Sequence, residues 1–243
     1  MEPTFSATQN PLQREFTEKT SPTNAAIIIT EGIAEAKNNG KSIAITTLDT
    51  EKAFDKLVHD KLFCKLYDYN INDDNWILIR QLQTQATTKV KLKGKSSKGF
   101  TTMQDIRQGA KLSPTLYKAY NNQLLNVLRD KKIGAMIGTT FIGCLTVADD
   151  IALIPDDHQD LQHALYVVQN ETQKDKFPIN ASKSEVVLIV NSNRNREPQK
   201  WTMGNMQIEE VQSTKHIDLI RQSEGKMTSP PESRKVDGLC MPC

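Results

Sequence analysis

The sequence predicts an α+β fold in which helices back an antiparallel β-sheet. Strand-like and helix-like segments alternate along most of the 243 residues, without an internal repeat. Two strand-like segments carry aspartate at one end, at Asp49 and at Asp149-Asp150. Short strands and amphipathic helices in this order favour one sheet with helices packed on it. We therefore expect the two acidic strand ends to lie on neighbouring strands.

Apolar residues at helical spacing predict the helices. They cover about residues 23–37, 60–69, 74–85 and 157–174, and a long one begins at Ser113. Asn39-Gly40 is a stop signal for the first of them. Ser113 as N-cap, with Pro114 at the first helical position, is the start signal of the long helix.

Runs of β-branched and apolar residues predict the strands. They cover residues 43–48 and 185–190 and both sides of Asp149-Asp150. Residues 88–93 and 99–103 alternate like a hairpin whose loop, 94–98, is basic. Its lysines favour contact with a nucleic-acid strand, although edge strands also use lysine to avoid aggregation. These lysines are Lys89, Lys91, Lys93, Lys95 and Lys98.

Asp149 and Asp150 are the most informative pair, because they stand inside the otherwise apolar run 142–154. Neighbouring carboxylates repel one another, and burial among β-formers makes that repulsion more costly. A divalent cation removes the conflict. The alternative is an Asp-Asp turn that is simply solvated.

Asp49 is a third acidic group in a similar setting, at the end of strand-like residues 42–48. Mg²⁺ is usually held by carboxylates together with substrate phosphates, and paired metals stabilise an in-line phosphoryl displacement. The three aspartates would supply such ligands. The alternative for Asp49 is a helix N-cap that follows a strand.

Four ordered segments resemble the reverse transcriptase domain of non-LTR (LINE-type) retrotransposons. They are residues 48–55 (LDTEKAFD), 107–114 (RQGAKLSP), 147–150 (VADD) and 180–185 (NASKSE). Residues 11–26 are also similar to the fingers segment of such elements. The resemblance covers most of residues 10 to 220, and it implies a polymerase palm with part of the fingers before it.

The resemblance implies a catalytic role for four residues. Asp49, Asp149 and Asp150 would hold two Mg²⁺ ions, with Mn²⁺ as a possible substitute. Lys183 matches the family's candidate proton donor to the leaving pyrophosphate. A solvated lysine paired with Glu185 is the alternative role of Lys183.

Four further residues are implied as substrate-binding. Phe54 would pack beneath the incoming sugar and reject a 2′-hydroxyl, or it is a core phenylalanine on a first helical turn. Gln108 and Gly109 would approach nucleotide or template, and Arg107 would pair with phosphate or be solvated.

The implied organisation is a partial fingers segment (residues 1–40), a palm with fingers insertions (41–191), and a polar remnant with a disordered tail (192–243). The sequence departs from the family where glycine and basic residues are expected, at residues 15–18. An endonuclease and most of a thumb are not matched. A truncated copy with weak polymerisation is therefore expected.

Composition fits an intracellular globular chain. Charged residues make up 25% and the net charge is only +2, so any affinity for nucleic acid must come from local clusters. No stretch reaches the length of a membrane span, and the start lacks the pattern of a secretory signal. The four cysteines form no disulfide or zinc framework, and Cys240 and Cys243 lie in the predicted tail.

The function predicted from these features is RNA-directed DNA polymerase activity. The expected partners are an RNA or DNA template with its primer and dNTPs. The alternative is a vestigial or domesticated nucleic-acid-binding domain that keeps the fold without turnover.

Overall fold

The structure is a computed structural model of the chain. It describes residues 9–15, 17, 20–51, 53–101, 105–106, 110–177, 179–189, 199–217, 219–224 and 226–228. Arg107, Gln108, Gly109, Cys240 and Cys243 lie outside the described residues.

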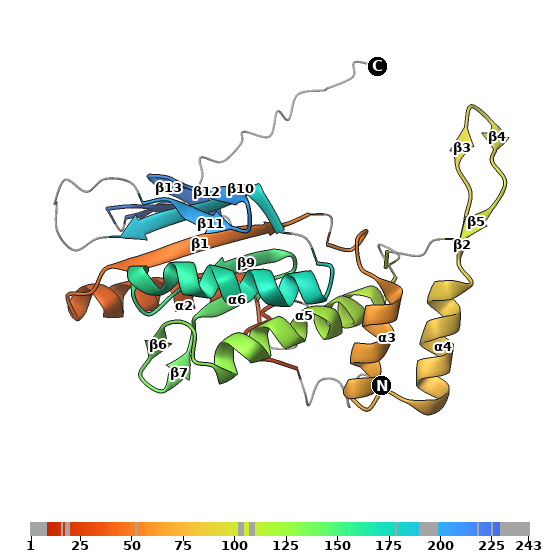
Figure 1. The fold of residues 1–243 in the computed structure, drawn as a ribbon, viewed down its shortest axis with the longest axis horizontal. Helices are drawn as coiled ribbons and strands as arrows, with labels where there is room; N and C mark the ends of the chain where they lie inside the picture. The colour runs from red at the N-terminus through yellow and green to blue at the C-terminus, as the bar shows by residue number, and fades with distance from the viewer. Residues whose placement is uncertain are drawn as a thin grey trace, which may run out of the picture.

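One mixed sheet forms the centre of the described part (Figure 1). Its strands are, in spatial order, β11 (Trp201–Met203), β12 (Met206–Glu210), β10 (Ile179–Ile189), β1 (Ile43–Thr50), β9 (Asp150–Leu153) and β8 (Cys144–Val147). Neighbours are antiparallel except β10 and β12, which run parallel. The apolar residues of β1 are almost completely buried, because strands flank it on both sides and helices cover one face.

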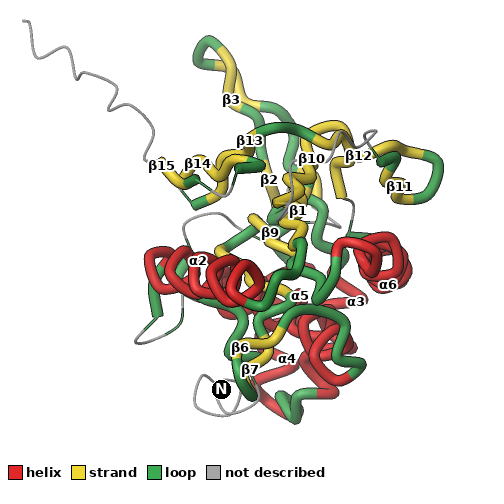
Figure 2. The backbone as a smooth tube through the Cα atoms, turned by 90° about the vertical axis from the view of Figure 1, so that its left-hand side faces the viewer, coloured by secondary structure: helices red, strands yellow, loops and turns green. Residues whose placement is uncertain are grey.

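The helices lie on one side of this sheet (Figures 1 and 2). They are α2 (Pro22–Asn38), α3 (His59–Asp68), α4 (Asp73–Thr84), α5 (Ser113–Asp130) and α6 (Leu161–Lys174), the last preceded by a 3₁₀ turn, η1 (His158–Asp160). Ser21 caps α2, since its hydroxyl accepts a hydrogen bond from the N–H of Asn24 at 3.2 Å. This sheet with helices on one side confirms the predicted α+β palm-type architecture. No helix in the described ranges is long and apolar enough to cross a bilayer.

Small sheets complete the described part. Strands β13 (Ser213–His216), β14 (Leu219–Gln222) and β15 (Met227–Thr228) form one of them, and β6 (Met136–Ile137) pairs with β7 (Thr140–Phe141). Residues 201–210, which we expected beyond the palm, form β11 and β12 of the central sheet; β12 pairs with β10, and β11 pairs with β12.

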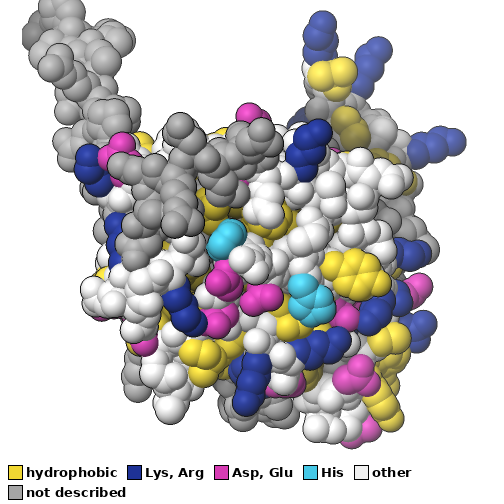
Figure 3. All heavy atoms as spheres, turned by 60° about the vertical axis from the view of Figure 1, so that its left-hand side comes forward, with side chains coloured by type: hydrophobic (Ala, Val, Ile, Leu, Met, Phe, Trp, Pro, Cys, Tyr) yellow, Lys and Arg dark blue, Asp and Glu magenta, His cyan; other side chains and the backbone are white. Residues whose placement is uncertain are grey.

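The predicted basic hairpin projects away from the body of the molecule (Figure 1), and its lysines stand out at the upper right of Figure 3. It consists of two nested ladders: β2 (Thr87–Thr88) pairs with β5 (Phe100–Thr101), and β3 (Lys91–Leu92) pairs with β4 (Lys95–Ser96). The prediction of a loop over 94–98 is corrected, because the turn is Lys93-Gly94 with φ of 46° and 79°. Glycine adopts this left-handed geometry readily and closes a two-residue hairpin.

Two further local predictions are corrected. The cap position of α5 is Leu112, and Ser113 is the first helical residue, so Ser113 is not the N-cap. Lys183 lies inside β10, which begins six residues earlier than predicted, at Ile179. Residues 181–184 oppose only Leu48 and therefore form a bulge in β10.

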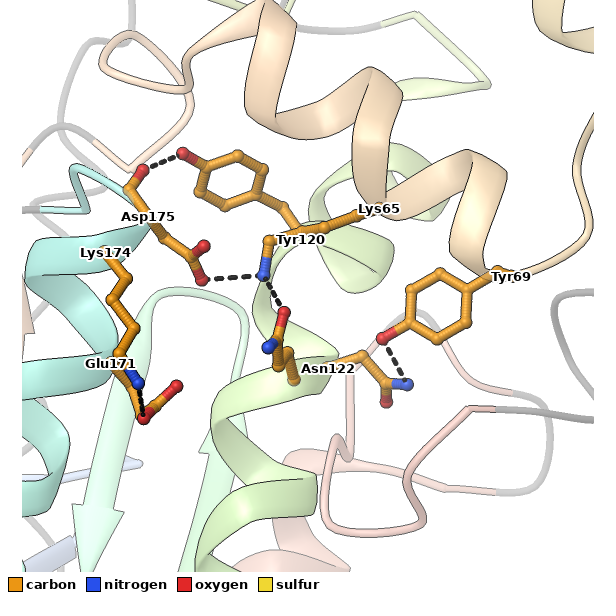
Figure 4. Close-up of polar contacts among 8 residues, drawn as sticks. Lys65, Tyr69, Tyr120, Asn122, Glu171, Lys174 and Asp175 are labelled. Carbon is orange, nitrogen blue, oxygen red and sulfur yellow. Dashed lines mark hydrogen bonds and ion pairs between the residues drawn. The ribbon is translucent and has the colours of Figure 1, made fainter.

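A largely buried ion pair joins α3, α5 and the end of α6, which pack on one side of the sheet (Figure 4). The ammonium of Lys65 on α3 lies 2.6 Å from the carboxylate of Asp175 and 3.0 Å from the amide oxygen of Gln123. The hydroxyl of Tyr120 donates to the backbone carbonyl of Asp175. Burial lowers the pKa of Lys65, and the bond to Asp175 opposes that shift. These contacts fix α3, α5 and the end of α6 to one another.

Candidate active site

Asp49 and Asp150 meet on adjacent strands. They are register partners in the antiparallel pair of β1 and β9. Directly opposed residues of an antiparallel pair project from the same face of the sheet. Asp149 precedes Asp150 in the turn Ala148-Asp149, where Ala148 has a φ of 52°. The structure thus brings Asp49 beside the predicted hairpin tip.

Two hydroxyl groups hold the aspartate-bearing segments in place. Ser184, in the bulge of β10, accepts a hydrogen bond from the N–H of Asp49 at 3.2 Å and donates to the carbonyl of Asn180 at 2.8 Å. Thr50 donates to the backbone carbonyl of Asp149 at 3.0 Å. Ser184 is completely buried, and we had not singled it out from the sequence. No local pattern marks a serine that supports a neighbouring strand.

The N-terminal segment extends the sheet at β8 and carries Glu15 to the site. Thr146 exchanges backbone hydrogen bonds with it, donating to Leu12 at 3.0 Å and accepting from Arg14 at 2.8 Å. The Thr146 hydroxyl also donates to the amide oxygen of Gln13 at 2.8 Å. Glu15 follows directly, at the predicted departure from the family pattern.

The acidic groups influence one another. Burial raises the pKa of Asp150, and the charges of Asp149 and then Asp49 raise it further. Burial likewise raises the pKa of Glu15, with smaller contributions from Asp149 and Asp150. Four carboxylates from three separate segments therefore share one electrostatic environment.

A cavity of about 450 Å³ opens beside these aspartates. Asp49, Asp150 and Lys183 line it together with residues of β13. From β13, Thr214 donates to the carboxylate of Glu185 at 2.6 Å, and its hydroxyl lies 3.2 Å from that of Thr47. The contribution of β13 was not predicted, because this strand is short and polar.

Lys183 lines this cavity, and none of the described carboxylates forms an ion pair with it. Lys183 and Glu185 are both described, and they do not form an ion pair within 4 Å. Instead the Glu185 carboxylate is engaged by Thr214. Lys183 is exposed to solvent, as the alternative role expects, but the ion pair with Glu185 is not formed.

Phe54 lies in the turn after β1, not on a helix, and it is partly buried. Its ring stacks on that of Tyr117 with centroids 4.7 Å apart and an interplanar angle of 25°. Tyr117 is fully buried on α5, and burial followed by the charge of Asp149 raises its pKa. Tyr117 thus supports one face of the Phe54 ring, and Phe54 does not line the 450 Å³ cavity.

Carboxylate oxygens are ligands that Mg²⁺ prefers. A bound cation would also reduce the repulsion between neighbouring carboxylates, which raises the pKa of Asp150. Among the described residues, however, no three His, Cys, Asp or Glu side chains are gathered closely enough to enclose a metal ion. The aspartates fit a divalent cation by donor type and by strand pairing. In the arrangement seen here they do not form a closed ligand shell.

A palm-type sheet with acidic strand ends defines a polymerase class of fold. The chain belongs to the reverse transcriptase (RNA-dependent DNA polymerase) family, whose pattern matches residues 4–228. It is similar to the Pol polyprotein of the retrotransposable element R2DM of Drosophila melanogaster, with 24% identity over 91% of this chain and 22% of that protein. An R2 Pol polyprotein of Nasonia vitripennis shares 23% identity over 88% of this chain and 22% of its own length.

The chain therefore spans about a fifth of the length of these relatives. The predicted resemblance to non-LTR retrotransposon reverse transcriptases is confirmed. Solved structures share the fold: telomerase of Candida albicans in complex with a telomeric RNA fragment has a TM-score of 0.61 at 12% identity, over 94% of this chain and 38% of that one. Apo telomerase of Candida tropicalis has a TM-score of 0.59 at 14% identity, over 87% and 40% respectively.

Proposed function

We propose that this chain is the catalytic palm of an RNA-directed DNA polymerase that extends a primer 3′-hydroxyl with dNTPs. One observation carries the proposal: Asp49 pairs across the strands with Asp150, and the charges of Asp149 and Asp49 raise the pKa of Asp150. Membership of the reverse transcriptase family supports it.

Asp49, Asp149 and Asp150 would hold the divalent ions, two Mg²⁺ or Mn²⁺ in their place. Bound metal supplies stabilisation of the attacking and leaving oxygens in an in-line displacement. The chain's own groups then have separate tasks. Ser184 hydrogen-bonds to the backbone of Asp49, and Lys183, which lines the cavity, would give a proton to the leaving pyrophosphate.

Phe54 supports discrimination between sugars. Its ring is backed by Tyr117, so a sugar above it meets a wall that cannot retreat into the core. Arg107, Gln108 and Gly109 keep their proposed role in substrate binding from the family resemblance alone.

The projecting hairpin is proposed to contact the template–primer backbone. Lys91 and Lys95 are exposed along it, and exposed Leu92 and Phe100 offer apolar surface beside them. Cationic and aromatic side chains together are the usual combination for single-stranded nucleic acid.

The position of Glu15 favours the second candidate function, a nucleic-acid-binding domain without turnover. Its carboxylate adds negative charge beside Asp149 and Asp150, where the triphosphate of a dNTP would have to approach. Like charge at that position weakens binding of an anionic substrate.

Primer extension on an RNA template, with Mg²⁺ and separately with Mn²⁺, tests the proposal. We expect incorporation by the wild type and by Asp156→Asn, a matched change at an exposed surface aspartate. Asp149→Asn should lower incorporation by more than about 100-fold, the scale of losing a preorganised electrostatic group. Retained template–primer binding without incorporation in the wild type would instead support the second candidate.

A further inference from the structure

Arg221 on β14 is a buried cation, and no carboxylate among the described residues forms an ion pair with it. Its side chain is 1% exposed. One nitrogen, Nη1, donates to the backbone carbonyl of His216 at 3.0 Å, while Nε and Nη2 have no hydrogen-bond partner in the described part of the chain. An unpaired buried charge is strongly unfavourable, because the interior does not replace its hydration. Two donors of a planar fork are thus left for a ligand.

Arg221 lines a cavity of about 240 Å³ formed by α2, the end of β10 and the β14–β15 segment. Two more cations line it, Lys37 and Lys226. Lys37 donates to the backbone carbonyl of Glu224 at 3.3 Å, and Lys226 pairs with the Glu224 carboxylate at 2.7 Å near the surface. No acidic side chain appears among the described residues that line the cavity.

We propose that this cavity is a phosphate-binding site. A phosphate or phosphodiester group would accept two parallel hydrogen bonds from Nε and Nη2 of Arg221, which is the geometry that the guanidinium fork provides. Lys37 and Lys226 would add positive charge at the mouth of the cavity. The rest of the wall is formed by Thr30, Ile33, Ala34 and Ile189.

Burial lowers the pKa of Arg221 to about 10, and no acidic neighbour raises it again. A protonated guanidinium is therefore present at neutral pH without a carboxylate to neutralise it. A bound anion would offset the free-energy cost of burying this unpaired positive charge.

The site is separate from the proposed polymerase centre. Ile189, on its wall, pairs with Ile43 at the start of β1, and Asp49 lies six residues further along that strand. At about 3.4 Å per residue this places the two sites roughly 20 Å apart. The phosphate could belong to a free ion or to a nucleic-acid backbone outside the polymerase centre.

Thermal unfolding of the full chain in inorganic phosphate, against chloride at equal ionic strength, tests the site. We expect phosphate to raise the Tm of the wild type by about 3 to 5 °C at saturation. Arg129→Met, which removes an exposed arginine, should keep that rise, and Arg221→Met should lose it. No phosphate-specific rise in the wild type, or an equal rise in Arg221→Met, would overturn the proposal.

A second variant covers the case in which Arg221→Met does not fold. Lys37→Gln combined with Lys226→Gln leaves the buried arginine in place and should weaken phosphate affinity about tenfold. Unchanged affinity in the double variant would count against the site.

The affinity for a short oligonucleotide, measured at several salt concentrations, distinguishes free phosphate from a nucleic-acid backbone. If a nucleic-acid backbone occupies the cavity, the slope of log affinity against log salt should decrease by about one in Arg221→Met. An unchanged slope, with the Tm effect present, assigns the site to free phosphate.

Discussion

His216 should make the stability of this chain depend on pH between neutral and acidic conditions. The side chain is 3% exposed on β13, and neither ring nitrogen has a hydrogen-bond partner among the residues that the structure describes. Burial, and secondarily the charge of Arg221, lowers the pKa of His216 to about 3 from an ordinary value of 6.5. Between these two values the unfolded chain binds a proton that the folded chain does not, so stability falls as the pH falls.

Each pH unit below 6.5 costs about 1.4 kcal/mol from this group. Between pH 7 and pH 4.5 the loss is therefore about 2.7 kcal/mol. Urea denaturation followed by circular dichroism at half-unit steps measures it, with His216→Phe to remove the effect and His163→Phe as a matched change at an exposed histidine. Because carboxylates also titrate in this range, the difference between wild type and His216→Phe is the quantity to compare.

The reasoning is refuted if the wild type and His216→Phe lose stability in parallel down to pH 4.5. An NMR titration that shows the His216 ring protonating near pH 6.5 in the folded chain would refute it independently. That measurement does not require the variant to fold.

Three other predictions concern the site and its support. Ser184→Ala should cost about 1–3 kcal/mol, because it leaves the N–H of Asp49 without its partner, and kinetics should show a several-fold lower kcat with little change in KM. Phe54→Ala should raise the ratio of ribonucleotide to deoxyribonucleotide incorporation; an unchanged ratio with a loss of about 3–5 kcal/mol in the unfolding free energy would show a residue that only packs. Lys65→Met should cost up to about 3 kcal/mol in chemical denaturation, since the half-buried Asp175 carboxylate loses its partner, and Asp175→Asn in the same chain should recover part of that loss.

Sequence reasoning predicted the elements whose patterns are local. The helix α2 and strand β1 are found within one or two residues of their predicted bounds, because spacing and stop signals act over a few residues. The sequence also predicted that the acidic strand ends lie on neighbouring strands, and Asp49 is indeed the register partner of Asp150.

The parts that were missed depend on distant contacts. Ser184 reaches Asp49 across a bulge, and a bulge leaves no periodic mark in a sequence. Glu15 reaches the site because residues 12–14 bond to Thr146, more than 130 positions away. The strands β11 to β15 are only two to five residues long, which is too short for a periodic pattern to be recognised.

The central claim is that Asp49, Asp149 and Asp150 together bind divalent cations. Titration of the full chain with Mn²⁺, followed by electron paramagnetic resonance of the free ion, measures this directly and does not require catalysis. We predict that the wild type and Asp156→Asn bind Mn²⁺ alike, and that Asp49→Asn and Asp150→Asn each weaken binding at least about tenfold, since carboxylate ligands set the affinity for such ions. Equal binding by the wild type and both site variants would contradict the claim.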